Sequence, residues 1–303
     1  MHGADPRLVL GLHRSRHRRD LLTAALDLGV TALDTAAPYL GFRSHLALAE
    51  TAADLLPKFT LSTKVGFFPS AGGTEHSLDP VRLRLAVERA ARELGGEPDT
   101  VLLHNPERSL AGLSPAHGRA LLGKACTVLA DAARDGLCRT WGVASWDTQS
   151  LGMVRVEGLP SPDVLMVRAG LLVGVDLLDA TNVLRTAWQA DETWGMSPFG
   201  GGHRKVWEDF DPRPFLRPPH DLSRVQAAFR TAFHLPVAAA MAVGTDDPGH
   251  LVQLVQAMAA EVDIAAVSQY LRALHGLRQG SSSATRRPAS FRAGASSGSS
   301  SYA

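Results

Sequence analysis

The sequence predicts an α/β protein that folds as a single-domain (β/α)8 TIM barrel with a flexible carboxyl-terminal tail. Short β-like runs alternate with longer amphipathic stretches, which is typical of parallel strands joined by crossover helices. Eight such units precede a polar terminus, and a chain of 303 residues accommodates a barrel of roughly 250 residues. No Pro/Gly-rich linker divides the sequence into halves. One barrel is therefore the expected architecture.

The eight expected strands follow one another with turn or helix-start signals between them. They are Leu8–Leu12, Ala32–Asp34, Phe59–Lys64, Thr100–His104, Thr140–Ala144, Asp163–Val167, Thr193–Met196 and Val237–Val243. The helix after the third strand has the clearest signals, because Asp79-Pro80 opens it and Gly95-Gly96 ends it.

Two polar segments fall outside this pattern. Residues 1–278 are expected to form the barrel, and residues 279–303, which are rich in Ser, Gly and Ala, a flexible tail with little apolar surface to bury. The longest irregular segment inside the barrel, Ser197–His220, follows the seventh strand. Loops of that length are usually functional, and this one lies on the face where barrels hold active sites.

Composition excludes several classes of protein. With 31 Lys+Arg against 30 Asp+Glu, neither a nucleic-acid wrapper nor an acidic disordered chain is expected. No apolar run approaches the ~20 residues that span a bilayer, and the amino terminus lacks the order of a signal peptide, so we expect a cytoplasmic protein. The twelve His show no ligand spacing for a metal, and Cys126 and Cys138 are expected to be buried.

Polar residues stand near the carboxyl ends of the second, third and fourth strands, the edge where barrels place their chemistry. They are Asp34 and Tyr39, then Lys64, then His104. A Lys that ends an apolar run is costly to desolvate without a carboxylate, and Asp34 on the adjacent strand is the expected partner. Because a nearby cation favours phenolate, we expect Lys64 to lower the pKa of Tyr39.

At this point the sequence resembles the aldo-keto reductase superfamily, from Arg7 to about Ala260. The motifs are Asp34-Thr35-Ala36 with Tyr39, Ser62-Thr63-Lys64-Val65-Gly66, Leu102-Leu103-His104-Asn105-Pro106, Gly142-Val143 with Trp146, Ser197-Pro198-Phe199, and Val243-Gly244-Thr245 with His250-Leu251. The resemblance implies reduction of a small aldehyde or ketone by NADPH or NADH in a monomeric enzyme. Tyr39 would be the general acid. Lys64 and Asp34 would tune it, and His104 would orient the carbonyl.

The resemblance also implies where the cofactor binds. The expected contacts are Ser145, Ser197, Pro198, Phe199, Gly201, Gly244 and Thr245. Neighbouring glycines at 200 and 202, with Arg204 and Lys205, would help to hold the pyrophosphate. Asp246 and Asp247 would disfavour the 2′-phosphate of NADPH relative to NADH.

Several positions depart from the family's cofactor pattern. Ala144-Ser145 replaces the Ser-Asn that holds the carboxamide, and Met166 and Ala169 replace a Gln and a stacking aromatic ring. Gln253-Leu254 replaces the Glu-Asn that reads adenine, and His13-Arg14 replaces small residues. The residues that handle protons therefore match the family better than those that hold the hydride carrier.

Three functions remain open. The first is the reductase, and the second uses the same acid–base residues without hydride, as a lyase, dehydratase, isomerase or cyclase. The third is a binding or regulatory barrel with a large exposed apolar interface. High Ala, Arg, Gly and Leu usage is typical of a GC-rich bacterial genome and suggests natural-product biosynthesis, that is, secondary metabolism. The basic segment 13–19 is interpreted as a solvated loop, with attraction of a substrate carboxylate or phosphate as the alternative. Trp146 and Trp194 are interpreted as pocket walls or as packing.

Overall fold

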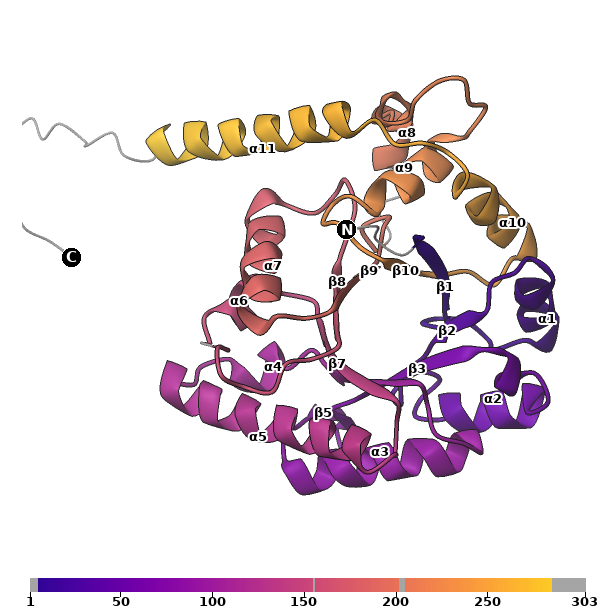
Figure 1. The fold of residues 1–303 in the computed structure, drawn as a ribbon, viewed down its shortest axis with the longest axis vertical. Helices are drawn as coiled ribbons and strands as arrows, with labels where there is room; N and C mark the ends of the chain where they lie inside the picture. Colours follow the sequence, from indigo (N-terminus) through magenta and orange to yellow (C-terminus); the bar gives the residue numbers. More distant parts are fainter. Residues whose placement is uncertain (1–4, 155, 202–204, 285–303) are drawn as a thin grey trace, which may run out of the picture.

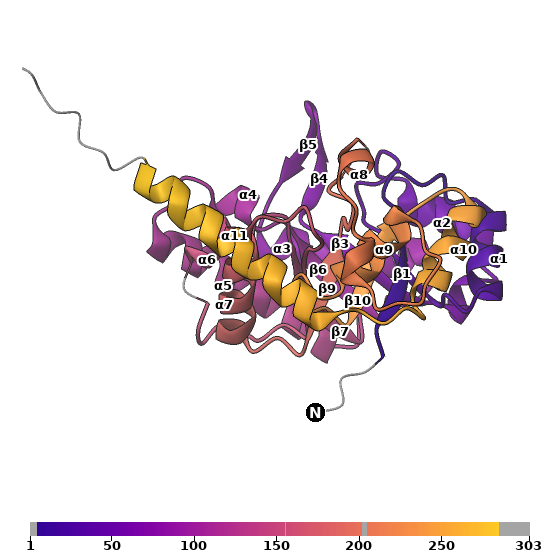
Figure 2. The ribbon, with the colours of Figure 1, turned by 90° about the horizontal axis from the view of Figure 1, so that it is seen from above.

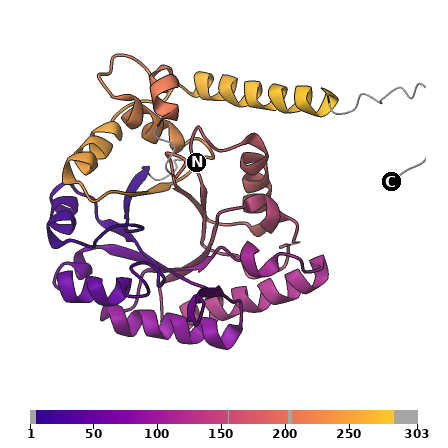
Figure 3. The same cartoon turned by 180° about the vertical axis from the view of Figure 1, so that it is seen from behind.

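The computed structural model describes residues 5–154, 156–201 and 205–284, and within them eight parallel strands close into a barrel surrounded by helices (Figure 1). The same ring is visible from behind (Figure 3). Around the barrel the order is β1 (Arg7–Gly11), β10 (Ala240–Gly244), β9 (Glu192–Met196), β8 (Val164–Arg168), β7 (Thr140–Ser145), β6 (Thr100–His104), β3 (Thr60–Val65) and β2 (Ala32–Asp34). The predicted fold is confirmed, and each expected strand overlaps an observed one.

Apolar side chains fill the inside of the barrel. This cluster consists of Val9, Leu102, Ala144, Val164, Met166, Trp194, Ala240 and Ala242. Close approach of β7 and β8 depends on Gly142, because a Cβ there would lie 2.3 Å from the carbonyl oxygen of Val164. Since the interior is packed, chemistry on this barrel has to take place at an end of the strands.

Helices cover the outside of the barrel. They are α1 (Arg19–Asp27), α2 (Ser44–Ala52), α3 (Pro80–Leu94), α5 (Pro115–Arg134), α7 (Val175–Trp188), α9 (Arg224–Ala232) and α10 (Pro248–Ala257), with the short α4 (Glu107–Leu110), α6 (Thr148–Gly152), α8 (Val206–Asp209), η1 (Leu56–Lys58) and η2 (Arg213–Phe215). The predicted start and end of α3 are confirmed. Asp79 Oδ1 accepts a hydrogen bond from the backbone N–H of Arg82 at 2.9 Å, and Gly95 ends the helix with φ 75°. Cys126 and Cys138 are buried, as expected.

A hairpin that the sequence did not predict follows β3. Its strands, β4 (Phe67–Ser70) and β5 (Gly73–His76), pair with each other and form a sheet separate from the barrel. It projects from the barrel on the same side as α8 (Figure 2). Because β4 begins two residues after the carboxyl end of β3, the hairpin stands beside the expected active face.

The last helix, α11 (Ile264–Ala284), lies across the outside of the barrel (Figures 1 and 3). Tyr270 Oη donates to the carbonyl oxygen of Leu171 at 2.6 Å, and Arg278 pairs with Asp176 at 2.7 Å. The helix continues past residue 279, where the tail was expected to begin, and residues 285–303 lie outside the described part of the chain. None of the described helices has the length and apolar character needed to cross a bilayer.

Candidate active site

Lys64 and Asp34 form a buried ion pair at the carboxyl ends of β3 and β2. Lys64 Nζ donates to Asp34 Oδ2 at 2.5 Å and to the carbonyl oxygen of Thr35 at 2.9 Å. Asp34 Oδ1 accepts from Ser62 Oγ at 2.9 Å. Burial by itself would lower the pKa of Lys64, but the Asp34 carboxylate and Tyr39 together hold that pKa above its usual value. The partner expected for Lys64 is therefore in place, and the amine is an ammonium.

Tyr39 lies next to this pair. Its Oη is 3.4 Å from Lys64 Nζ, which also lies 5.3 Å from the centre of the Tyr39 ring. Burial raises the pKa of Tyr39, and the opposing effect of the Lys64 charge does not reverse this shift. The pKa of Tyr39 is therefore raised overall, whereas we expected Lys64 to lower it. Tyr39 is a protonated phenol at neutral pH and has a proton to donate.

His104 ends β6, and its ring lies near the ring of Tyr39. Its ring centre is 6.4 Å from that of Tyr39 in an edge-on arrangement and 4.8 Å from that of Phe67. Burial, with the nearby charge of Lys64, holds the pKa of His104 well below its usual value. Its Nδ1 is buried and has no hydrogen-bond partner among the described residues. His104 is therefore a neutral imidazole with one N–H to offer.

A chain of hydrogen bonds runs behind the ion pair, from β2 to the loop after β1. Thr35 Oγ1 lies 2.5 Å from Ser44 Oγ, which lies 2.6 Å from Nε2 of His17. Nδ1 of His17 is 3.1 Å from the carbonyl oxygen of Ser15, so Nδ1 carries the proton and Nε2 accepts. Ser15 Oγ donates in turn to Asp246 Oδ1 at 2.8 Å. The chain links the loops after β1, β2 and β10.

This network corrects the interpretation of segment 13–19 as a solvated loop. Its arginines are exposed, but Ser15 and His17 are buried, and burial lowers the pKa of His17. His13 lies at the open end of the barrel, where its ring centre is 5.0 Å from that of Tyr39. The sequence placed His13 near the expected cofactor site, whereas His17, which stands among arginines, was not predicted to be buried.

Aromatic and cationic side chains surround the four candidate residues. Phe67 reaches in from the hairpin, and Trp146, which follows β7, is 45% exposed. The guanidinium of Arg168, at the end of β8, lies 5.1 Å from the Trp146 ring. Trp194 belongs to the apolar cluster inside the barrel. Of the two tryptophans, Trp146 is therefore exposed just after the carboxyl end of β7, and Trp194 is packing.

A family model described as "Aldo/keto reductase family" matches residues 13–270. The chain belongs to the aldo/keto reductase family. Asp34, Tyr39, Lys64 and His104 all lie within the matched region, so the resemblance inferred from their motifs is confirmed. Aldo-keto reductases are oxidoreductases that act on small carbonyl compounds. A comparison with curated protein sequences gave no significant match.

Solved aldo-keto reductases share this fold at low identity. The holo form of AKR11C1 from Bacillus halodurans is 18% identical with a TM-score of 0.69, over 90% of this chain and 93% of that one. A putative aldo-keto reductase from Pseudomonas aeruginosa is 22% identical with a TM-score of 0.60, over 83% and 90%. An enzyme from Klebsiella pneumoniae in complex with NADP and acetate is 17% identical with a TM-score of 0.62, over 89% and 91%.

The residues expected to bind the reductase cofactor lie after β7, β9 and β10. Ser145 ends β7 and is fully buried, and its Oγ donates to Glu107 Oε2 at 3.1 Å. Gly244 packs so closely on the loop after β1 that a Cβ there would lie 3.2 Å from the carbonyl oxygens of Gly11 and His13. Thr245 Oγ1 accepts from the backbone N–H of Asp247 at 3.0 Å, within the turn that starts α10.

The loop after β9 is a tight turn with left-handed backbone at several positions. Ser197, Gly200 and Gly201 have φ of 57°, 72° and 75°, and the backbone N–H of Gly200 donates to the carbonyl oxygen of Ser197 at 2.9 Å. Pro198 is buried against Gly170, and the Phe199 ring lies 6.5 Å from that of Phe229, which anchors the loop. Gly202 and Arg204 lie outside the described residues, and Lys205 is exposed.

The departures from the family pattern have structural explanations. Met166 is part of the interior cluster, and Ala169 and Leu254 are buried in the core between barrel and helices. The two carboxylates after β10 also have partners within the protein, since Asp246 accepts from Ser15 and Asp247 Oδ1 caps α10 through the N–H of Gly249 at 2.8 Å. Met166, Ala169 and Leu254 therefore all pack in apolar surroundings.

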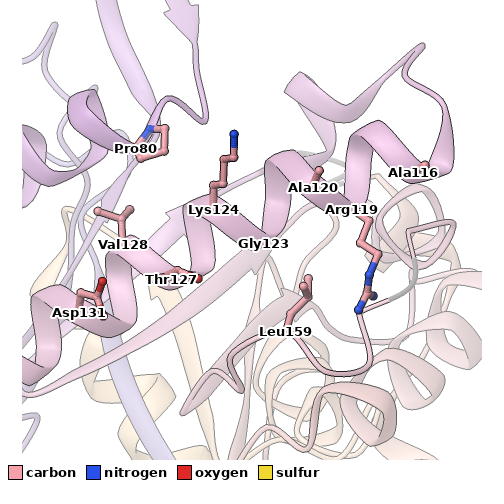
Figure 4. Close-up of a pocket in the computed structure, with 10 residues that line it drawn as sticks. All are labelled: Pro80, Ala116, Arg119, Ala120, Gly123, Lys124, Thr127, Val128, Asp131 and Leu159. Atoms are coloured by element: carbon pink, nitrogen blue, oxygen red, sulfur yellow. The ribbon is translucent and has the colours of Figure 1, made fainter.

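A surface depression of about 620 Å³ lies outside the barrel, along α5 and next to the start of α3 (Figure 4). Its lining includes Arg119, Lys124, Asp131 and Leu159, and none of the candidate residues contributes to it. The candidate active site is therefore the cluster of side chains at the carboxyl ends of the barrel strands, and this depression is separate from it. Across the described ranges, no group of three or more His, Cys, Asp or Glu side chains is arranged to hold a metal.

Proposed function

We propose that this protein reduces the carbonyl group of a small aldehyde or ketone with hydride from NADPH or NADH. The observation that carries the proposal is the contact of the Tyr39 phenol with a buried ammonium, Lys64, which is itself paired with Asp34. Membership of the aldo/keto reductase family supports the same reaction. The neutral His104 completes the set.

The protein's part in this reaction is proton transfer and orientation. The Tyr39 phenol donates its proton to the carbonyl oxygen, and the ammonium of Lys64, 3.4 Å away, stabilises the phenolate that forms. Asp34 holds Lys64 charged and in position. The N–H of His104 would bind the same carbonyl oxygen and so orient the carbonyl group toward the Tyr39 hydroxyl.

The residues fit a nicotinamide dinucleotide at its phosphates better than at its carboxamide. The N–H groups of the Ser197–Gly201 loop would hold the pyrophosphate, and Gly244 and Thr245 would line the adjacent turn. Ser145 would accept a hydrogen bond from the carboxamide, whereas Met166 offers none. When bound, the group would supply the hydride that the side chains cannot. Asp246 near the expected 2′-phosphate favours NADH over NADPH.

A cofactor-independent acid–base enzyme is the second candidate. The buried, apolar Met166 and Ala169 and the hydrogen bond of Ser145 to Glu107 favour it, because each removes or occupies a group expected to contact the nicotinamide. Tyr39 and His104 would then move protons on an enolisable carbonyl compound without hydride.

Calorimetric titration with NADPH and, separately, NADH tests the proposal. Micromolar binding of either would support the reductase and identify its cofactor. No binding at millimolar nucleotide would refute hydride transfer and leave the second candidate. Tyr39→Phe keeps the ring and removes the proton, so turnover should fall by about 10²-fold or more while nucleotide affinity is retained. If the variant turned over normally, Tyr39 would not be the acid.

A further inference from the structure

We propose that Arg108 and Arg168 form a carboxylate-binding subsite at the mouth of the barrel, so that the carbonyl substrate carries an acidic group. The inference rests on the proposed carbonyl reduction and names the substrate class of that same site. Arg168 ends β8, Arg108 lies in α4 just after the end of β6, and each guanidinium lies near an aromatic ring, that of Phe67 or of Trp146.

Arg108 lies close to His104. It is exposed in the first turn of α4, and its guanidinium is 5.4 Å from the centre of the Phe67 ring. Phe67 in turn is 4.8 Å from the His104 ring. After burial and Lys64, the charge of Arg108 is among those that lower the pKa of His104, which places this cation within electrostatic range of the reacting end.

Arg168 extends the positive charge across β7. It is half-buried at the end of β8, 5.1 Å from the Trp146 ring. The backbone N–H of Trp146 donates to Glu107 Oε1 at 2.8 Å, and Glu107 directly precedes Arg108. Glu107 therefore ties the segment with Trp146, and through its ring Arg168, to the helix that carries Arg108, and we refer to Arg108, Trp146 and Arg168 together as the arc.

No carboxylate of the described residues pairs with either guanidinium. On the outside of the barrel, by contrast, Arg84 pairs with Asp135 at 2.7 Å. The arc contains two acids, but both are engaged elsewhere. Glu107 accepts from the Ser145 hydroxyl and the N–H groups of residues 146 and 147, and Asp147 accepts from two N–H groups at the start of α6. The arc therefore has two cations free to bind an anion.

The chemistry of the arc selects a carboxylate on an apolar body. A guanidinium matches a carboxylate with two parallel hydrogen bonds, and the flat faces of Phe67 and Trp146 suit an aromatic or unsaturated substrate. The arc lies after β6, β7 and β8, whereas the glycine-containing loop proposed to hold the cofactor pyrophosphate follows β9. A cofactor phosphate would therefore bind elsewhere.

Paired substrates test the subsite. The kcat/KM for 4-carboxybenzaldehyde is compared with that for its methyl ester, which keeps the aldehyde and removes the charge. The native protein should prefer the acid, and Arg168→Gln or Arg108→Gln should reduce the acid-to-ester ratio by about 10-fold or more, mainly through KM. Arg92→Gln, an exposed site near the carboxyl end of α3, is the matched control and should leave the ratio unchanged.

Calorimetry with benzoate, which cannot be reduced, separates the two proposals. If neither aldehyde is reduced but benzoate binding depends on both arginines, hydride transfer fails and the subsite stands. If the acid-to-ester ratio is one, or is the same in both variants as in the native protein, the subsite is refuted. Weaker nucleotide binding with an unchanged ratio would assign the arginines to a cofactor phosphate and would also overturn the proposal.

Discussion

Replacing Lys64 by Met tests how strongly the buried ion pair holds the site together. The side chains of Lys64 and Asp34 are only 2% and 7% exposed, so the pair is almost completely removed from water. Lys64→Met leaves the Asp34 carboxylate with one side-chain donor, Ser62. Removing one partner of a buried pair costs about 3–5 kcal/mol, a large share of the roughly 5–15 kcal/mol that stabilises a typical protein.

The double variant Asp34→Asn/Lys64→Met measures the free energy with which the two side chains stabilise each other, apart from their contacts with the rest of the protein. It removes both charges, so it should lose less than the sum of the two single variants, with a coupling of about 1–3 kcal/mol. Arg19→Met, which breaks the solvent-exposed pair with Asp54, is the control and should change stability little.

Urea unfolding followed by circular dichroism gives the free energies of unfolding of the native protein, of Asp34→Asn, Lys64→Met and the double variant, and of the Arg19→Met control. A cost below about 1 kcal/mol for Lys64→Met, or strict additivity in the double variant, would refute the reasoning, because the pair would then behave like a surface salt bridge.

Three other expectations follow from the same geometry. Gly142→Ala places a Cβ 2.3 Å from the carbonyl oxygen of Val164 and should cost about 1–3 kcal/mol or more in urea unfolding, whereas Gly152→Ala, which meets nothing within 4 Å, should not disrupt packing. Burial lowers the pKa of His17 below its ordinary 6.5, so its contribution to stability should be complete above about pH 6.5 and lost as the pH falls below it. Urea unfolding at about pH 7.5 and about pH 5.5 measures how much stability is lost on acidification, and this loss should be smaller in His17→Gln. An equal loss in the variant would show that His17 is not the group responsible. The pKa of Tyr39 is raised from 10.0, so the rate of carbonyl reduction should stay level through about pH 9 and fall only above pH 10; a fall near neutrality would show that another group is the acid.

The strands and the four candidate residues could be predicted because their signals are local. Each strand is a short apolar run, and the polar residues Asp34, Lys64 and His104 end such runs on adjacent strands. Parallel strands bring their carboxyl ends to one edge, so sequence order alone places the three side chains together.

The remaining features depend on contacts between distant residues. The hairpin was not predicted because Phe67–Ser70 is short and contains a Pro, and its strands pair with each other across a tight turn. His17 stands among arginines in the sequence, yet its environment is made by Ser44 from α2. The direction of the Tyr39 shift depends on the balance between burial and the Lys64 charge, which motif spacing does not reveal.

The β4–β5 hairpin has a consequence for how this barrel can change over evolution or by engineering. Its ladder is independent of the barrel, while Phe67 contacts His104 and His76 Nδ1 lies 2.6 Å from Ser109 Oγ. Its tip can therefore be lengthened, shortened or exchanged without disturbing the register of any barrel strand, provided that Phe67 and His76 keep these contacts, including the 2.8 Å hydrogen bond from His76 Nε2 to the carbonyl oxygen of His104. Substrate range could then diversify through one short insertion, while the proton-handling residues beneath it stay as they are.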